Sequence, residues 1–251
     1  MDTRNEPPSQ FYRGLIAEMY QPLVAHHPRA DDYAPFLDAS GTPALELGCG
    51  SGQPLLDLVA RGYHVEGLDA SQDMLVLCRQ AAAERGLEVT LHQAEMQSFS
   101  LPQRYRAIFL AGATFTLLTS DDDAAAALSR IHAHLEPGGS ALIPLDLPNT
   151  TPVGDFHEHT KEDGTVLRVG VISQTTGRDG CSWNAVMRYE RRAPGHEPEV
   201  VEREYRRRWW PQARFREMLH AAGFDKTTFI DPAGGKAAPE ASLFVALARR
   251  D

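Results

Sequence analysis

One segment, ALELGCGSGQ at residues 44–53, constrains the fold of this 251-residue chain more than any other feature. It begins as a short apolar strand, and glycines follow at positions 48, 50 and 52. The apolar spacing of residues 54–62 then predicts an amphipathic helix. Glycines between a strand and a helix let the backbone turn sharply and let a ligand approach it closely. The segment therefore indicates the start of a parallel sheet with a ligand site at the turn.

Residues 63–147 repeat this alternation of strand and helix. The predicted strands are residues 63–69, 88–95, 106–112 and 140–146, and the predicted helices are residues 71–86 and 121–139. Ser71 is the expected N-cap of its helix, and Gly86 the expected terminator. Upstream, apolar residues at helical spacing predict helices over residues 11–27 and around 31–38. Alternation of this kind favours an α/β fold with a mostly parallel sheet covered on both faces.

Beyond residue 150 the pattern changes to consecutive strands. The predicted strands are residues 165–173, 182–192 and 199–210, with turns at 177–180 and 194–195. We expect residues 151–210 to form a small antiparallel β insert over the active site of a single domain that spans residues 11–251. A helix that begins near Pro211 and a strand at residues 242–250 close this domain. Residues 1–10 are polar and contain two prolines, so we expect a disordered tail.

Charge and hydropathy argue against several classes of function. The chain has 25 Lys and Arg against 34 Asp and Glu, and a net charge of −9 repels phosphate backbones. The most basic stretch, residues 188–208, holds seven Arg but also five Glu, which favours ion pairs across strands. We therefore expect no nucleic-acid partner. There is no apolar run long enough to span a membrane, no signal peptide, and no residue pattern that demands a metal, so we expect a cytoplasmic protein without a membrane partner.

An acidic residue at the end of the next predicted strand is the second feature that points to a ligand. Asp69 ends the second predicted strand, 17 residues beyond Gly52, where a carboxylate can accept hydrogen bonds from both hydroxyls of a ribose. Together the turn and Asp69 predict an adenosine site. Three features favour S-adenosylmethionine over NAD as its occupant: the G-x-G-x-G spacing, the acidic Glu95 after the third strand, and the LEPGG segment before the fifth strand.

At these motifs the chain resembles the class I S-adenosylmethionine-dependent methyltransferases. The matching segments are ALELGCGSGQ, GLDASQDML, HQAEM, AIFLAGATFTLL and HLEPGG. Within that superfamily the chain is most similar to small-molecule N-methyltransferases, such as the aminosugar N,N-dimethyltransferases and glycine N-methyltransferase. The resemblance implies a Rossmann-like, doubly wound, seven-stranded and mostly parallel sheet with an N-terminal helical lid and a small antiparallel β insert.

The resemblance also implies roles for residues around the cofactor, S-adenosyl-L-methionine. Gly48 and its loop neighbours contact the methionine moiety, Asp69 binds the ribose, Glu95 and Met96 hold the adenine, and Tyr20 and Tyr33 close over the cofactor. The full set implied is Tyr20, Tyr33, Glu46, Gly48, Cys49, Gly50, Gly52, Asp69, Ala70, Met74, Glu95, Met96, Leu110 and Ala111. The family usually has Asp at position 95 and often Gly at position 94, where this chain has Glu and Ala.

The sequence offers several candidates for the methyl acceptor site. His157 and His159 share one face of an extended segment and could act as a base or a metal pair, or belong to a solvated loop. Asp146 could meet an amino group or cap a loop. Arg208 and Trp209 could form a substrate pocket, or the tryptophan could pack in the core. Tyr20 joins the two histidines as a catalytic candidate.

These observations predict a methyltransferase that acts on a small molecule. An amine nitrogen is the first expected acceptor, followed by a hydroxyl and then by carbon, because only an amine needs no general base beyond its own deprotonation. Two alternatives from other classes remain open at this point: a non-catalytic partner protein that binds the cofactor, and an NAD-dependent oxidoreductase. The sequence leaves a monomer and a homodimer equally open.

Overall fold

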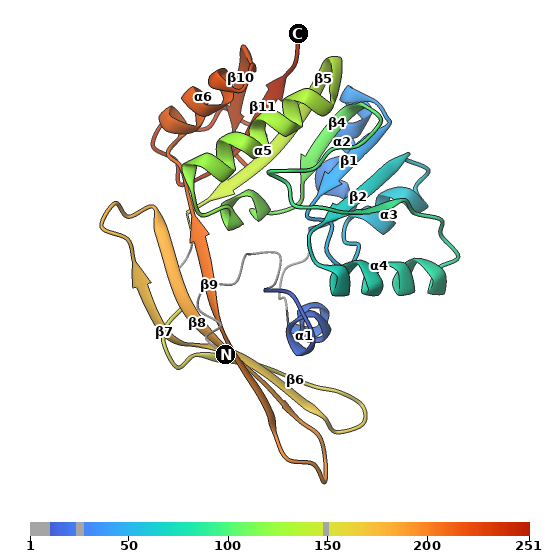
Figure 1. The fold of residues 1–251 in the computed structure, drawn as a ribbon, viewed down its shortest axis with the longest axis vertical. Coiled ribbons are helices and arrows are strands. Elements are labelled where there is room, and N and C mark those ends of the chain that lie inside the picture. Colours follow the sequence, from blue (N-terminus) through green and yellow to red (C-terminus); the bar gives the residue numbers. More distant parts are fainter. Residues whose placement is uncertain (1–10, 24–27, 148–150) are drawn as a thin grey trace.

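Two β-sheets organise the chain, and together they make up most of the fold in Figure 1. The structure is a computed structural model that describes residues 11–23, 28–147 and 151–251. The expected tail at residues 1–10 and the end of the first expected helix, residues 24–27, lie outside this range. Among the described residues no helix is long and apolar enough to cross a membrane.

The first sheet has seven strands in the order β10-β11-β5-β4-β1-β2-β3. Its strands are β1 (Ala44–Leu47), β2 (Val65–Asp69), β3 (Leu91–Gln93), β4 (Tyr105–Leu110), β5 (Leu135–Asp146), β10 (Lys226–Ile230) and β11 (Leu243–Arg249). All neighbours pair in parallel except β11, which is antiparallel to both β5 and β10. The prediction of a seven-stranded, mostly parallel sheet is confirmed.

Helices cover both faces of this sheet, as expected for a doubly wound fold. They are α2 (Ala30–Ser40), α3 (Leu55–Ala60), α4 (Gln72–Glu84), α5 (Asp121–His134) and α6 (Gln212–Ala221). One core cluster joins α5 and α6 to the sheet, and a second joins α2, α3 and α4 to it. The central strand β1 is buried on both faces, because none of its four residues is exposed. Ser71 caps α4 by accepting a hydrogen bond from the amide of Met74, as predicted.

The carboxyl ends of the central strands meet at one edge of the sheet. Leu47 at the end of β1 pairs in register with Leu68 of β2 and with Leu110 of β4. The order of strands reverses between β1 and β4, because the chain winds outward from β1 to β3 and then returns to β4 on the other side. Ligands of doubly wound proteins bind at such a switch point, beyond the carboxyl ends of the strands.

The second sheet is the predicted insert, in the order β6-β7-β8-β9. Its antiparallel strands are β6 (Phe156–Thr160), β7 (Val166–Thr176), β8 (Ser182–Arg192) and β9 (Glu199–Arg208). Helix α1 (Leu15–Leu23) packs on this sheet through Leu15 and Met19, which contact Leu167 of β7. In Figure 1, α1 lies between the insert and the helices of the first sheet.

The arginines of the insert form the predicted ion pairs. Across β8 and β9, Arg191 pairs with Glu199 at 2.5 Å and Arg188 with Glu202 at 3.4 Å. Glu190 is buried and is surrounded by three arginines: Arg168, Arg188 and Arg192. Each of these guanidinium groups therefore has a carboxylate beside it, which accounts for much of the basic stretch within an acidic chain.

Three elements differ from the prediction. The insert has four strands rather than three, because the polar segment at 156–160 pairs as the exposed edge strand β6. Strand β10 was not identified, since its sequence, KTTFI, has too few apolar residues for a clear pattern. The fifth helix ends at His134 and the LEPGG segment already belongs to β5, because Pro137 cannot continue a helix and Gly138 has a φ of +79°.

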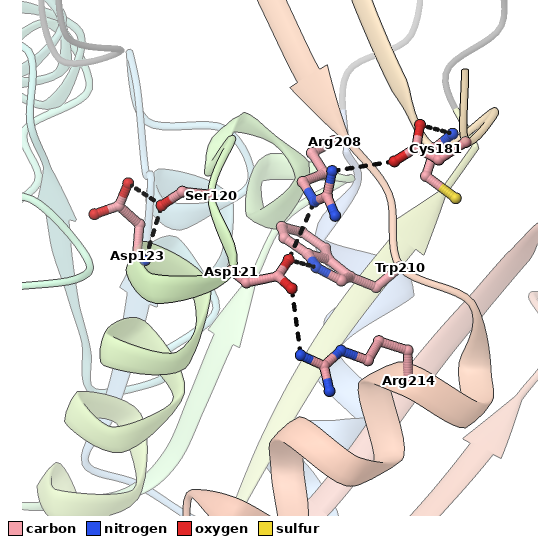
Figure 2. Close-up of polar contacts among 8 residues, drawn as sticks. Ser120, Asp121, Asp123, Cys181, Arg208, Trp210 and Arg214 are labelled. Carbon is pink, nitrogen blue, oxygen red and sulfur yellow. Dashed lines mark hydrogen bonds and ion pairs between the residues drawn. The ribbon is translucent and has the colours of Figure 1, made fainter. Parts of the chain in front are cut away.

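A cluster centred on Asp121 connects the insert to the core where β9 leads into α6 (Figure 2). The Oδ1 atom of Asp121, the first residue of α5, accepts hydrogen bonds from Nε1 of the buried Trp210 at 2.9 Å and from Nε of Arg208 at 3.2 Å. Its Oδ2 atom accepts one from Arg214 of α6 at 3.3 Å. Arg208 is the last residue of the insert, and Trp210 and Arg214 follow it in the sequence. Asp121 therefore fixes the position at which the insert returns to the first sheet.

We predict that the acceptor atom of Asp121 matters more to stability than its charge. Asp121→Ala leaves the buried Trp210 N–H without a partner, at a cost of about 1–3 kcal/mol in the free energy of unfolding. Asp121→Asn keeps an oxygen for that N–H and loses only ion pairs with half-exposed arginines, worth up to about 1 kcal/mol. Urea denaturation of both variants measures the difference. Equal losses for Asn and Ala would contradict the assignment.

Candidate active site

A pocket lies at the edge of the sheet where β1, β2 and β4 end, and it encloses about 780 Å³ of space, part of it open to solvent. It lies at the switch point of the strand order. Its lining residues are Tyr12, Tyr20, Gly48, Gly50, Leu68, Asp69, Ala70, Ser71, Met74, Ala94, Glu95, Met96, Gln97, Thr114, Leu117 and Leu118. Eight of the fourteen residues that the resemblance implied for the cofactor therefore meet in one cavity: Tyr20, Gly48, Gly50, Asp69, Ala70, Met74, Glu95 and Met96.

The glycine turn forms one wall of the pocket. Gly48 and Gly50 have φ angles of +73° and +53°, a backbone conformation that side chains disfavour. A Cβ on Gly48 would overlap the methyl group of Thr114, and one on Gly50 would lie 3.2 Å from Cε of Met74. Only glycine therefore keeps this wall open, which is the reason the sequence motif needs glycine at these two positions.

Asp69 connects the ends of β1 and β2. Its Oδ2 atom accepts a hydrogen bond from the amide of Gly50 at 2.8 Å, and its Oδ1 atom accepts one from the amide of Ser71 at 2.8 Å. Burial raises the pKa of the Asp69 carboxyl above its ordinary value, although the amides of Ser71, Gly50 and Ala70 act to lower it. A carboxylate has about four acceptor positions, so Asp69 retains capacity for hydroxyl groups of a ligand.

The rest of the pocket lining combines apolar and polar groups. Met74, Met96, Leu117 and Leu118 supply a surface suited to a flat ring. The carboxylate of Glu95 accepts a hydrogen bond from Nε2 of Gln97 at 2.8 Å, which holds it at the cavity wall. This arrangement can recognise a ring that carries an amino group.

Glu46 lies beneath the glycine turn, fully buried in the middle of β1. Among the described residues neither of its carboxyl oxygens has a hydrogen-bond partner. Burial, together with the neighbouring Asp69, raises the pKa of Glu46 well above its ordinary value. The side chain is therefore held as a neutral acid under the site rather than as a charge within it.

Other predicted residues surround the pocket without lining it. The hydroxyl of Tyr33 accepts a hydrogen bond from the amide of Gly112 at 2.9 Å, so its side chain braces the loop after β4. Leu110 and Ala111 are buried at the end of β4, and Thr114 from the next turn reaches the cavity instead. Cys49 is buried and burial raises the pKa of its thiol, which fits a packing role. A Cβ on Gly52 would meet Leu56 and Cys78, so this glycine serves helix packing.

Two tyrosines from the N-terminal segment close the pocket. Tyr20 was predicted here and Tyr12 was not, and their rings meet edge to face at 5.4 Å between centroids. Burial raises the pKa of Tyr20 to about 12 and the pKa of Tyr12 well above its ordinary value. Both hydroxyls are therefore protonated at neutral pH.

The structure places His157 and His159, which the sequence predicts near the pocket mouth, on the insert. Both lie on β6, share one face of it as predicted, and are exposed. Strand β6 is the edge of the insert separated from β9 by two strands, and β9 is the strand that returns to the core. Neither histidine lines the pocket, and among the described residues no group of three His, Cys, Asp or Glu side chains could hold a metal ion.

The predicted acceptor residues are also engaged elsewhere. Asp146 forms an ion pair with Arg207, a residue that the sequence did not single out. Arg207 also donates from Nε to the hydroxyl of Thr116 at 2.8 Å, which ties β9 to the turn after β4. Arg208 faces Asp121 and Asp179 (Figure 2), so its predicted role in a substrate pocket is not supported by its contacts.

Trp209 packs against the core rather than lining the pocket. Its ring lies edge to face with Phe244, 6.3 Å between centroids. Its Nε1 is buried and has no hydrogen-bond partner among the described residues. The alternative of core packing, which the sequence left open, therefore describes this tryptophan better than the stacking pocket does.

Sequence reasoning missed about half of the lining. The residues not predicted are Tyr12, Leu68, Ser71, Ala94, Gln97, Thr114, Leu117 and Leu118. Four of them, Leu68, Ser71, Ala94 and Gln97, adjoin predicted residues in the sequence, and a fifth, Tyr12, precedes α1. The other three, Thr114, Leu117 and Leu118, come from the short 3-10 turn η3 (Thr114–Leu117) and the residue after it. Their segment, TFTLL, was recognised as a motif, but no spacing rule indicates which of its side chains turn inward.

The fold and the pocket together define a class of protein: a doubly wound nucleotide-binding domain with a glycine turn and a carboxylate at the end of β2. Comparison with known proteins narrows this class. Residues 44–139 match the family model described as a methyltransferase domain. The CcbJ methyltransferase from Streptomyces caelestis has the same fold, with a TM-score of 0.74, 24% sequence identity and coverage of 96% of this chain and 98% of that one.

Two curated relatives are similar in sequence. The dTDP-3-amino-3,6-dideoxy-alpha-D-glucopyranose N,N-dimethyltransferase of Streptomyces fradiae is 32% identical over 178 residues, which cover 66% of this chain and 68% of that protein. The dTDP-3-amino-3,4,6-trideoxy-alpha-D-glucopyranose N,N-dimethyltransferase of Streptomyces venezuelae is 31% identical, over 50% of this chain and 52% of that protein. The chain belongs to the S-adenosylmethionine-dependent methyltransferases, and S-adenosylmethionine is its methyl donor.

We predict that Glu46→Gln stabilises the ligand-free protein more as the pH rises. The folded protein holds the Glu46 proton more tightly than the unfolded chain does, because burial raises the pKa. The resulting stability is fully present below the ordinary glutamate pKa and is lost as the pH rises toward the raised value. Glutamine never ionises, so the variant should gain about 1–3 kcal/mol over wild type at pH 8 and little at pH 5.

Glu66→Gln is the matched control for this prediction. Glu66 lies in the adjacent strand, and bonds from His92, Tyr105 and Gln103 outweigh burial and lower the pKa of its carboxyl. Thermal denaturation of both variants and of wild type, at pH 5 and at pH 8, measures these differences. It should therefore show Glu66→Gln losing stability relative to wild type at pH 8. A constant difference between Glu46→Gln and wild type from pH 5 to pH 8 would be inconsistent with a neutral buried acid.

Proposed function

We propose that this enzyme methylates an amine nitrogen of a small molecule, an amino sugar in the first instance, from S-adenosylmethionine bound in the pocket at the ends of β1, β2 and β4. The observation that carries the proposal is the meeting of Gly48, Gly50 and Asp69 in one cavity. The amine is supported by the two curated relatives, both of which are named as N,N-dimethyltransferases of amino sugars.

The residues present fit this cofactor. The wall at Gly48 and Gly50 leaves space that a Cβ would fill, so the methionine end can lie against the backbone. Asp69 has acceptor positions left for the ribose hydroxyls. Met74, Met96 and Leu118 can sandwich the adenine, while Glu95 accepts a hydrogen bond from its amino group. These roles follow from the lining, and each can be tested by substitution.

S-adenosylmethionine supplies a methyl group already activated on a positive sulfur. The protein therefore contributes alignment and exclusion of water more than covalent chemistry. Tyr12 and Tyr20 close one side of the pocket, and the insert is proposed to cover the acceptor, with Arg207 fixing β9 to the turn after β4. An acceptor held there would face the pocket.

The chemistry of the lining favours an amine over a hydroxyl. A hydroxyl acceptor needs a general base, whereas an amine needs only to be deprotonated when it arrives. The titratable side chains of the lining are Tyr12, Tyr20, Asp69 and Glu95. The raised pKa values keep both tyrosines protonated, so they cannot accept a proton at neutral pH, and the two carboxylates already accept hydrogen bonds.

We predict that Asp69→Ala weakens binding of S-adenosylhomocysteine at least tenfold. Hydrogen bonds to a charged group contribute about 1.5–3 kcal/mol, and this variant removes those expected from the ribose. Isothermal titration calorimetry measures the change. Asp57→Asn, in the half-exposed ion pair of α3 with Arg85, is the control and should bind like wild type. A folded Asp69→Ala protein with unchanged affinity would rule out this cofactor position.

The proposed function is tested with dTDP-3-amino-3,6-dideoxy-alpha-D-glucopyranose and dTDP-glucose as paired acceptors. Mass spectrometry should find the amino sugar heavier by one or two methyl groups and the hydroxyl sugar unchanged. A wider panel of amines and phenols follows if neither reacts. Methylation of hydroxyl acceptors alone would overturn the assignment of an amine. Binding of NADH in place of S-adenosylhomocysteine would overturn the cofactor assignment.

A further inference from the structure

A cluster of tyrosines continues from the pocket into the insert. Tyr12 lines the pocket, Tyr189 lies on β8 and Tyr205 on β9. The ring of Phe11 packs against all three, with its centroid 4.9 Å from those of Tyr12 and Tyr205 and 6.3 Å from that of Tyr189. We define these three phenols, Tyr12, Tyr189 and Tyr205, as the tyrosine cluster.

The hydroxyl groups of the cluster lie close to one another. Tyr12 shares a hydrogen bond with Tyr205, and burial and the phenols of Tyr205, Tyr20 and Tyr189 raise the pKa of Tyr12. Burial and the phenol of Tyr205 raise the pKa of Tyr189 as well. The residues that supply these groups are far apart in the sequence, but the packing of α1 against the insert brings them together. All three residues are only partly buried.

Such a cluster disfavours negative charge and favours positive charge. The face of an aromatic ring is electron-rich and attracts cations, most strongly where water is excluded. The phenol oxygens also offer lone pairs to N–H groups. Every neighbour that shifts Tyr12 and Tyr189 is another phenol that acts to raise the pKa, so the surroundings oppose the phenolate form.

We propose that Tyr12, Tyr189 and Tyr205 form the subsite that receives the acceptor nitrogen and stabilises the positive charge it gains on methylation. This inference rests on the proposed function, since it takes the pocket as the cofactor site. In the transfer, the nitrogen lone pair forms the new N–C bond while the electron pair of the C–S bond leaves with sulfur. The positive charge passes from sulfur to nitrogen, and the surplus proton leaves to water with the product.

Neutral phenols suit this step better than a carboxylate does. A carboxylate beside the incoming amine would stabilise its ammonium form and so remove the lone pair that must react. Protonated phenols stabilise the ammonium form of the amine less before the transfer. Their ring faces and oxygen atoms nevertheless stabilise the positive charge that develops on nitrogen during the transfer. The nearest predicted carboxylate for this purpose, Asp146, is already paired with Arg207.

The subsite is tested with small probes, because it does not depend on the identity of the full acceptor. Protein labelled with 13C at the tyrosine ε positions is saturated with S-adenosylhomocysteine and titrated with tetramethylammonium chloride, with sodium chloride as the ionic-strength control. Tert-butyl alcohol serves as the neutral probe of similar shape. The signals of Tyr12, Tyr189 and Tyr205, assigned with single Tyr→Phe variants, should shift saturably with the cation and not with the alcohol.

Two substitutions sharpen the test. Tyr205→Leu removes a ring and should weaken tetramethylammonium binding at least tenfold, whereas Tyr205→Phe keeps a ring face and should weaken it less. Tyr63→Phe changes a partly buried tyrosine that donates to Asp38, and this matched control should bind the cation as wild type does. The affinity for S-adenosylhomocysteine should change by less than twofold in all three variants, since none of these residues lines the pocket.

The outcomes separate the subsite from the proposed function. Wild type that fails to bind S-adenosylhomocysteine contradicts the proposed function. Normal binding of S-adenosylhomocysteine with equal shifts from the cation and the alcohol, or with no shifts in the cluster, overturns the subsite alone. Unchanged tetramethylammonium affinity in Tyr205→Leu also overturns it, provided that the variant melts at the wild-type temperature with S-adenosylhomocysteine bound. A variant that fails to fold is replaced by Tyr189→Leu in the same titration.

Discussion

The hydrogen bond from the amide of Gly50 to the carboxylate of Asp69 is the contact on which the site depends. It joins the turn after β1 to the end of β2, two segments that parallel pairing already places side by side. The same carboxylate also accepts a hydrogen bond from the amide of Ser71, the residue that caps α4. One side chain therefore orders the glycine turn and the start of a helix, and the pocket lies between them. Beneath the turn, the buried Glu46 has no hydrogen-bond partner among the described residues, and burial and the neighbouring Asp69 raise its pKa, which disfavours a second negative charge there.

The insert is stabilised by other interactions, chiefly ion pairs and small apolar clusters of its own. Its strands carry ion pairs, three of them around Glu190, and apolar and aromatic groups that pack with α1, so it has its own small cores. It is fixed to the first sheet chiefly where β9 ends, through Arg207 with Asp146 and Thr116 and through the cluster around Asp121. These charged contacts, together with the buried Trp210, hold the insert against the first sheet.

Prediction from the sequence succeeded where a residue's role is local. The glycine turn, the cap at Ser71 and the carboxylate at the end of β2 each follow from neighbours along the chain, and the structure brings Gly48, Gly50 and Asp69 into one pocket. It was incomplete where a role depends on distant packing. His157 and His159 were placed by their distance along the chain from β5, whereas the pairing of β6 with β7 puts both on an exposed edge strand of the insert, and neither lines the pocket.

The sequence by itself determined the α/β class, the alternation of strands and helices and the chemistry of the glycine turn, because hydrophobic period and backbone conformation are properties of adjacent residues. The family followed from the same motifs. Only the tertiary structure decided which side chains contact one another. Arg207 forms an ion pair with Asp146, and Trp209 packs against the core. Tyrosines from the segment before α1, from β8 and from β9 meet beside the pocket. Those contacts join segments up to about two hundred residues apart, and their geometry is fixed by how the two sheets and α1 pack rather than by any spacing along the chain.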